Sequence, residues 1–208
     1  MSLLKDILKA IEYFNINPDC RQYAYDAIIN HIRQRSIQKL NIDDMEAIRH
    51  FLAQWRVRGT DRIDRKALLI SIKAIADTLN ELNKISILTI NVAKYGKKIE
   101  QSYKMIRNVY GVGDTSTSKI IHLFAPSLFV MWDKNIAILY KVVMDSYIYT
   151  YKFLPEMQKI AKSVLNELAR NEGCTLDEAE KILRIKAKGR TLAKITDEYN
   201  WLRATGRI

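Results

Sequence analysis

Apolar residues recur at intervals of three or four along almost the whole chain, which is the spacing of amphipathic helices. One face of the first such segment carries Leu4, Ile7, Leu8, Ile11 and Phe14. The same pattern predicts further helices over residues 19–36, 42–55, 63–85, 97–110, 134–144, 153–168 and 190–205. No run alternates convincingly with the period of a strand, and seven glycines and three prolines leave little material for all-β turns. We therefore predict an all-α fold.

Polar residues mark several of the helix ends. Asn41 precedes two acids and is expected to cap the third helix, and Thr175 with Glu178 forms a capping-box pattern that opens a late one. The run 17–19, Asn-Pro-Asp, is expected to break the chain between the first two helices, and a short helix after Ser86 should stop at Gly96. The tyrosine-rich run 147–151 fits either a loop or a helix.

Two glycines around one valine interrupt the pattern near the middle of the chain. Gly111 and Gly113 can adopt backbone angles closed to other residues, and they let a backbone or a phosphate approach closely. Asp114 or Thr115 is expected to cap the helix that follows. Because the first N–H groups of a helix lack intrahelical partners, this end would suit a phosphate.

The composition favours a polyanionic partner. The 208 residues carry 34 Lys and Arg against 23 Asp and Glu, a formal charge of +11, and 48% of them are hydrophobic. A globular domain this basic often binds nucleic acid, although a solvated basic surface gives the same total. A basic loop at residues 56–66 and a basic cluster at residues 184–194 are each expected to be solvated, with contact to a phosphate backbone as the alternative.

Metal, membrane and secretion signals are not expected. Cys20 and Cys174 lie far apart and form no metal-ligand cluster with His31, His50 or His122. An iron–sulfur cluster needs about four thiolates, so we expect no cofactor and no metal. No apolar run approaches the roughly 20 residues of a membrane span, and the first residues lack the regions of a signal peptide. We expect a cytoplasmic protein.

The run Tyr110-Gly-Val-Gly113, the helix after it, and Asp133 resemble the helix-hairpin-helix superfamily of DNA glycosylases. Asp133 follows Gly113 by 20 residues, and Pro126 lies in the intervening loop. The resemblance implies one all-helical domain of two lobes over residues 1–208, with the hairpin and its acid in residues 97–145. It implies that the hairpin amides grip a phosphate of double-stranded DNA and that Asp133 is catalytic. The motif region covers about 40 residues.

The chain departs from the family at the lysine of its bifunctional members. Those members carry a Schiff-base lysine two residues after the second glycine, where this chain has Thr115. Lys119 is one helical turn further on, and we expect it to reach the same wall only with distortion. The loop before Asp133 also lacks glycine. This leaves a monofunctional enzyme or a member without catalysis.

The residue types fit N-glycosidic cleavage. Cleavage builds positive charge on the sugar, which a carboxylate at Asp133 would stabilise while orienting water. The base must first leave the stack, so an aromatic pocket is required, for which Trp132, Phe129 and His122 are candidates. An ordinary helix N-cap at Asp133, and core positions for His122 and Trp132, explain the same residues.

Two classes of function therefore stay open. The first is a monofunctional DNA glycosylase that removes a damaged or mismatched base. The second is a non-catalytic DNA-binding module that uses the same hairpin, alone or in a larger assembly. In both, the DNA contacts are expected from the hairpin and its flanks: Gly111, Val112, Gly113, Thr115, Ser116, Lys104, Arg107 and Lys119.

Overall fold

The computed structural model describes residues 2–17 and 20–208, and this part of the chain is helical without any strand. The α-helices are α1 (Leu3–Ile16), α2 (Cys20–Arg33), α3 (Ile42–Gln54), α4 (Arg65–Ala74), α5 (Ala76–Leu82), α6 (Val92–Arg107), α7 (Asp114–Phe124), α8 (Lys134–Leu139), α9 (Ser146–Ile148), α10 (Leu154–Glu172), α11 (Leu176–Lys186) and α12 (Leu192–Ala204). The predicted all-α class is confirmed. The expected break at residues 17–19 falls largely on residues outside the described part.

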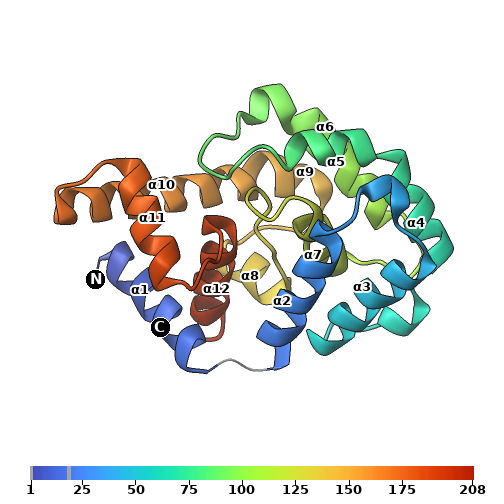
Figure 1. Cartoon of the computed structure of the whole chain (residues 1–208), viewed down its shortest axis with the longest axis horizontal. Coiled ribbons are helices and arrows are strands. Elements are labelled where there is room, and N and C mark those ends of the chain that lie inside the picture. Colours follow the sequence, from blue (N-terminus) through green and yellow to red (C-terminus); the bar gives the residue numbers. More distant parts are fainter. Residues whose placement is uncertain (1, 18–19) are drawn as a thin grey trace.

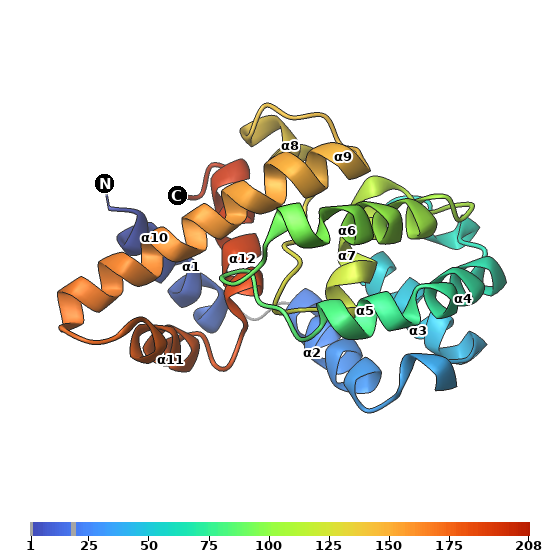
Figure 2. The same cartoon turned by 90° about the horizontal axis from the view of Figure 1, so that it is seen from above.

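The helices form two groups that meet along α8 and α12 (Figures 1 and 2). Helices α2 to α7 pack on one another in the first group, and α1, α10, α11 and α12 pack together in the second. The first and last parts of the chain therefore lie side by side, with α1 against α12.

Several helix ends follow the local sequence signals. The Asn41 side chain accepts hydrogen bonds from Asp43 and Asp44, and Asp44 closes the capping box. Thr175 and Glu178 form the second predicted capping box, at the start of α11. Both predicted caps are confirmed. They could be predicted from the sequence because a capping box depends only on residues three positions apart.

Other helix boundaries depart from the pattern. The predicted helix 63–85 divides into α4 and α5 at Ile75, and the predicted stop at Gly96 is wrong because α6 runs through it. Gly96 leaves room for the Tyr151 ring: a Cβ there would lie 2.6 Å from the ring, which would have to shift. The predicted helix 134–144 ends at Leu139, after which Lys141 takes a positive φ of 54°. The run 149–153 forms a π-helical turn that leads into α10.

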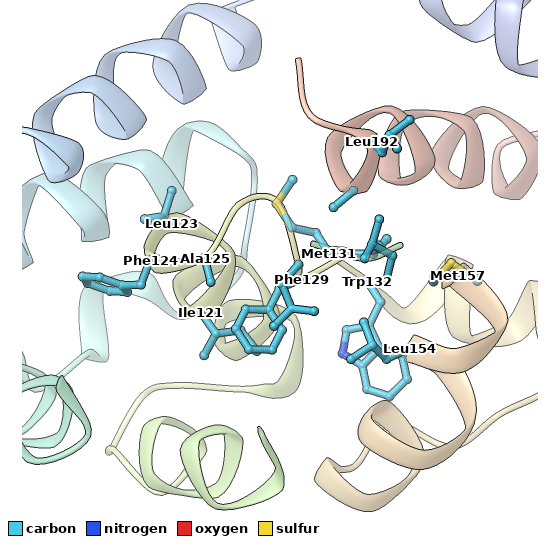
Figure 3. Packing of buried hydrophobic residues seen from close by; sticks show 14 of the residues in the cluster. Ile121, Leu123, Phe124, Ala125, Phe129, Met131, Trp132, Leu154, Met157 and Leu192 are labelled. Carbon is cyan, nitrogen blue, oxygen red and sulfur yellow. The ribbon is translucent and has the colours of Figure 1, made fainter. Parts of the chain in front are cut away.

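The segment before Asp133 has no regular secondary structure and lies among the buried hydrophobic residues of the core (Figure 3). Phe129, Val130, Met131 and Trp132 are fully buried. The Trp132 ring contacts Tyr149 and Phe153, with ring centroids 5.0 Å apart in both pairs, and its indole N–H donates to the Tyr103 hydroxyl at 3.0 Å. This core fixes the place at which α8 begins.

The turn between α6 and α7, here called the glycine turn (residues 108–113), packs directly on the basic loop (residues 56–66). Gly111 has φ +83°, and a Cβ on it would lie 2.5 Å from the Arg62 carbonyl carbon and oxygen. The Asp64 amide donates to the Tyr110 carbonyl at 3.1 Å. Gly113 has extended angles and open space around it. Gly111 is therefore required for close packing on the basic loop, whereas Gly113 is not.

We predict that Gly111→Ala destabilises the fold by about 2 kcal/mol or more, because it combines a strained φ with a backbone clash. Gly113→Ala is the matched control and should change the free energy of unfolding by less than about 0.5 kcal/mol. Urea unfolding of both variants measures the difference. Equal stabilities would contradict the close packing of the glycine turn on the basic loop.

Candidate functional site

Asp133 is held at the start of α8 by the buried segment behind it. Its Oδ1 accepts a hydrogen bond from the Ile136 amide at 2.9 Å, so it is the N-cap of that helix. The Ser118 hydroxyl of α7 accepts from the Trp132 amide at 3.2 Å and lies 3.1 Å from the Trp132 carbonyl oxygen. Asp133 is half-buried, and its Oδ2 has no partner among the residues described. The hydrogen bond to Oδ1 therefore orients the carboxylate, and Oδ2 is free to interact with a ligand.

A cavity of about 670 Å³ opens beside Asp133, between the two helix groups. Its rim includes exposed residues such as Arg56, Arg58 and Lys134, and its floor includes the buried Lys194 and Glu198. The buried Lys119 lies in its wall. The remaining lining residues are Phe14, Arg21, Gln22, Trp55, Val57, Gly113, Asp114, Thr115, Ser116, Asp133, Asn135, Ile136, Met144, Asp197 and Trp201.

The N-terminus of α7 forms one wall of this cavity. Gly113 is its N-cap, and no side chain caps the helix, so the expectation that Asp114 or Thr115 would cap it is wrong. A glycine cap leaves the first-turn amides without a side-chain acceptor, and such amides favour an anion. Gly113, Thr115 and Ser116 lie on the cavity.

Four other predicted DNA contacts, Lys104, Arg107, Gly111 and Val112, do not line the cavity. Val112 is buried, and Gly111 packs on Arg62. The Arg107 guanidinium donates to the Val112 carbonyl at 2.9 Å and to Asp114 at 3.2 Å, so it braces the glycine turn. Lys104 forms an exposed ion pair with Glu100.

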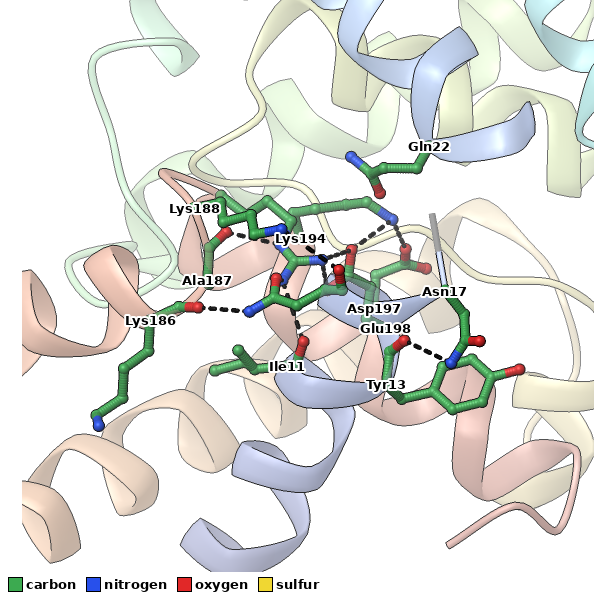
Figure 4. Close-up of polar contacts among 12 residues, drawn as sticks. Ile11, Tyr13, Asn17, Gln22, Lys186, Ala187, Lys188, Lys194, Asp197 and Glu198 are labelled. Atoms are coloured by element: carbon green, nitrogen blue, oxygen red, sulfur yellow. Dashed lines mark hydrogen bonds and ion pairs between the residues drawn. The ribbon is translucent and has the colours of Figure 1, made fainter. Parts of the chain in front are cut away.

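Four charged residues form a buried group under the cavity, which we call the α12 ion group: Arg190, Lys194, Asp197 and Glu198 (Figure 4). Lys194 Nζ lies 2.9 Å from Asp197 Oδ2 and 3.5 Å from Glu198 Oε1. Arg190 pairs with Glu198 at 3.2 Å and also donates to Asn15 Oδ1 at 2.7 Å. Burial raises the pKa of Glu198, and the neighbouring Lys194 and Arg190 oppose that rise.

The α12 ion group corrects the prediction for the basic cluster at residues 184–194. Arg190 and Lys194 are buried and paired instead of solvated, whereas Arg184, Lys186 and Lys188 are exposed. Asp197 and Glu198 stand three and four residues after Lys194, which is the spacing of helical ion pairs. That spacing was the signal in the sequence that could have revealed the group.

Lys119 lies in the cavity wall without distortion of α7. It is 6% exposed, and its Nζ lies over the Trp55 ring, 4.4 Å from the centroid. No carboxylate forms an ion pair with it in the described part of the chain. Burial lowers its pKa, and the nearby Asp197 and Asp133 oppose that shift. The expectation of a distorted approach is therefore wrong.

The aromatic residues on the cavity are not the predicted ones. Trp132, Phe129 and His122 are fully buried and lie off the cavity. Phe14, Trp55 and Trp201 line it instead. The helical pattern assigned Phe14 and Trp55 to a core face, and periodicity alone does not distinguish a core from the wall of a cavity.

The basic loop also contributes to the rim. Arg56 and Arg58 are exposed on the cavity, and Arg56 adopts a positive φ of 56°. The charged residues of the loop are exposed, as expected for a solvated connection, and the place of Arg56 and Arg58 on the rim leaves contact with a ligand as the alternative.

No group of three or more His, Cys, Asp or Glu residues suited to a metal occurs among the residues described, and no described helix is long and apolar enough to cross a membrane. Comparison of the chain with protein-family models, with curated proteins and with solved structures finds no match. The site is therefore interpreted from its own geometry.

The buried imidazole of His122 makes the stability of the fold depend on pH. Its Nδ1–H donates to the Phe129 carbonyl at 2.5 Å, so its Nε2 accepts from the Tyr25 hydroxyl at 2.8 Å. Burial lowers the pKa of His122 from 6.5 to about 4. Because the unfolded chain binds this proton more readily, the neutral imidazole stabilises the fold above pH 6.5, and that contribution is lost as the pH falls toward 4.

We predict that the wild type loses stability between pH 6.5 and 4, by roughly 3 kcal/mol from His122 alone. His122→Gln removes the titrating group, and its stability should vary less over this interval. Urea unfolding at several pH values measures both. Parallel pH profiles for the two proteins would contradict a neutral buried His122.

Proposed function

We propose that the protein binds double-stranded DNA and hydrolyses the N-glycosidic bond of a base extruded into the cavity beside Asp133. The observation that carries this proposal is the shared wall: one cavity is bounded by the Asp133 carboxylate and by the uncapped N-terminus of α7. Its volume of about 670 Å³ falls within the roughly 300–1,000 Å³ of small-molecule sites.

The positions of the groups around the cavity suggest which of them bind the nucleotide chain and which contact the extruded base. The α7 amides favour a phosphate of the nucleotide chain, and Arg56 and Arg58 add positive charge on the rim. A base turned out of the stack would then enter beside Asp133. Net cationic character at the mouth supports a polyanionic substrate, in line with the chain's charge of +11.

Asp133 would carry the chemistry. As the bond from the sugar carbon to the base nitrogen breaks, positive charge develops on the sugar, and a nearby carboxylate stabilises it. A water oxygen bonds to the sugar carbon, one of its protons passes to Asp133 Oδ2, and the departing base nitrogen takes up a proton from solvent. The hydrogen bond from Ile136 holds the carboxylate in one orientation throughout.

We predict that Asp133→Asn lowers the rate of base release by 10²- to 10⁴-fold, the usual contribution of a positioned acid–base group. The measurement is the formation of abasic sites in duplexes that each carry one altered or mismatched base. Asparagine is as good an N-cap as aspartate, so the variant should keep its stability and its DNA affinity. Asp145→Asn is the matched control, because Asp145 caps α9 in the same way but lies off the cavity.

The alternative function, a non-catalytic DNA-binding module, uses the same amides and the same rim. It predicts equal behaviour of the wild type and Asp133→Asn in every assay. If no base in a broad panel is released by the wild type, the enzyme is excluded and the binding module is left.

We predict that log affinity for duplex DNA falls linearly with log salt, with a slope of about −0.9 per phosphate contact. Gly113→Ala should weaken binding to all sequences alike, because its Cβ would stand where a phosphate approaches the α7 amides. Fluorescence anisotropy across a salt series measures both effects. A flat salt response would contradict both functions.

A further inference from the structure

Two polar atoms on the cavity, Lys119 Nζ and Asp197 Oδ1, have no hydrogen-bond partner among the described residues. Lys119 has no carboxylate partner among the described residues, although its Nζ is nearly buried in the cavity wall. Asp197 Oδ2 accepts a hydrogen bond from Lys194, whereas Asp197 Oδ1 has no partner in the part of the chain that the structure describes. Among the described residues, the fully buried polar atoms without a hydrogen-bond partner are Ser102 Oγ and Glu198 Oε2, so Lys119 Nζ and Asp197 Oδ1 are still accessible from the cavity. Both atoms can therefore form a hydrogen bond with a ligand.

These groups offer opposite hydrogen-bonding character. Lys119 donates in either protonation state, and the Asp197 carboxylate accepts. They are separated by more than an ion-pair distance, since no bridge joins them, yet they are close enough for Asp197 to influence the pKa of Lys119. Asp133 also influences that pKa, so Lys119 lies within electrostatic reach of both carboxylates.

The charge balance of the cavity disfavours a cation. Its lining carries six Lys or Arg side chains against four Asp or Glu side chains. The acidic members are largely engaged: Asp114 with Arg107, and Glu198 with Arg190 and Lys194. A positively charged base would face the unpaired Lys119, and burying like charges together costs free energy.

We propose that the cavity selects a neutral base that presents a carbonyl oxygen beside an N–H group, as uracil and hypoxanthine do. Lys119 donates to the carbonyl, Asp197 accepts from the N–H, and the rings of Trp55, Trp201 and Phe14 provide apolar contact. Bases that are cationic, or that lack the N–H, are rejected because one of the two groups stays unpaired. This selectivity rests on the proposed function.

The test measures duplex affinity in the Asp133→Asn background, where base release does not consume the substrate. Each duplex carries one uracil, hypoxanthine, 1,N6-ethenoadenine (neutral, without the N–H) or 1-methyladenine (cationic), and an unmodified duplex is the reference. Thymine and guanine carry the same edge, so uracil and hypoxanthine are each placed in a mismatch, where they leave the stack more readily than the paired bases of the reference. Uracil or hypoxanthine should then be bound at least about tenfold more tightly than the reference, and the other two should not.

Lys119→Met should reduce this preference by about tenfold, the loss of one buried hydrogen bond to a charged donor. Lys134→Met removes a lysine from the exposed rim of the same cavity and should weaken all duplexes equally, so the preference should persist. Asp197→Asn should also lose the preference. Because Asp197 pairs with the buried Lys194, thermal unfolding is recorded alongside, and Lys119→Met decides the matter if Asp197→Asn does not fold.

The outcomes separate the two proposals. Base release by the wild type with a preference that Lys119→Met leaves intact overturns the assignment of Lys119 and keeps the enzyme. A preference for 1-methyladenine overturns the charge argument in the same way. If the wild type releases no base and binds no altered duplex more tightly than the reference, the proposed function fails and this selectivity fails with it.

Discussion

The α12 ion group is the constraint on which the rest of the structure depends. Removing one partner of a buried ion pair typically costs about 3–5 kcal/mol, because the other charge is left uncompensated. Arg190 joins Glu198 to Asn15 and to the Ile11 carbonyl of α1, and Lys194 joins Asp197 and Glu198 to the rings of Tyr25 and Trp55. The group therefore links the second helix group to the first and forms the floor of the cavity.

The opposite wall depends on packing instead of charge. The buried segment that ends at Trp132 is held by Ser118, Tyr103 and the α10 side of the core, and it delivers Asp133 to the start of α8. The glycine turn is pressed against Arg62 and braced by Arg107, which sets the direction in which α7 begins. Close-packed interiors transmit position in this way because their side chains have little room to move. Asp133 and the α7 amides are thus fixed relative to each other, although 20 residues separate Asp133 from Gly113.

A cavity between a charged floor and a packed wall can keep positive charge at its mouth separate from negative charge inside. Binding a polyanion needs positive charge at the mouth, and stabilising a positive sugar needs an acid inside. Here the exposed arginines are on the rim, whereas Asp133 is half-buried beside a helix N-terminus. In the proposed selectivity, Lys119 and Asp197 discriminate between ligands because both are nearly buried, where a hydrogen bond that a ligand fails to make costs most.

The sequence by itself determined the all-α class, the caps at Asn41 and Thr175, and the glycine turn, because each depends on residues within one or two turns of a helix. Several helix boundaries, such as the division at Ile75 and the end of α8 at Leu139, were decided by tertiary packing. The sequence also singled out Asp133, which stands at a helix start. Only the tertiary structure decided which residues share the cavity. Trp132, Phe129 and His122 entered the core, whereas Trp55, Trp201, Lys119 and the acids of α12 reached the cavity. Helical periodicity reports that a face is buried, but whether it meets a core or a cavity depends on contacts between segments far apart in the chain.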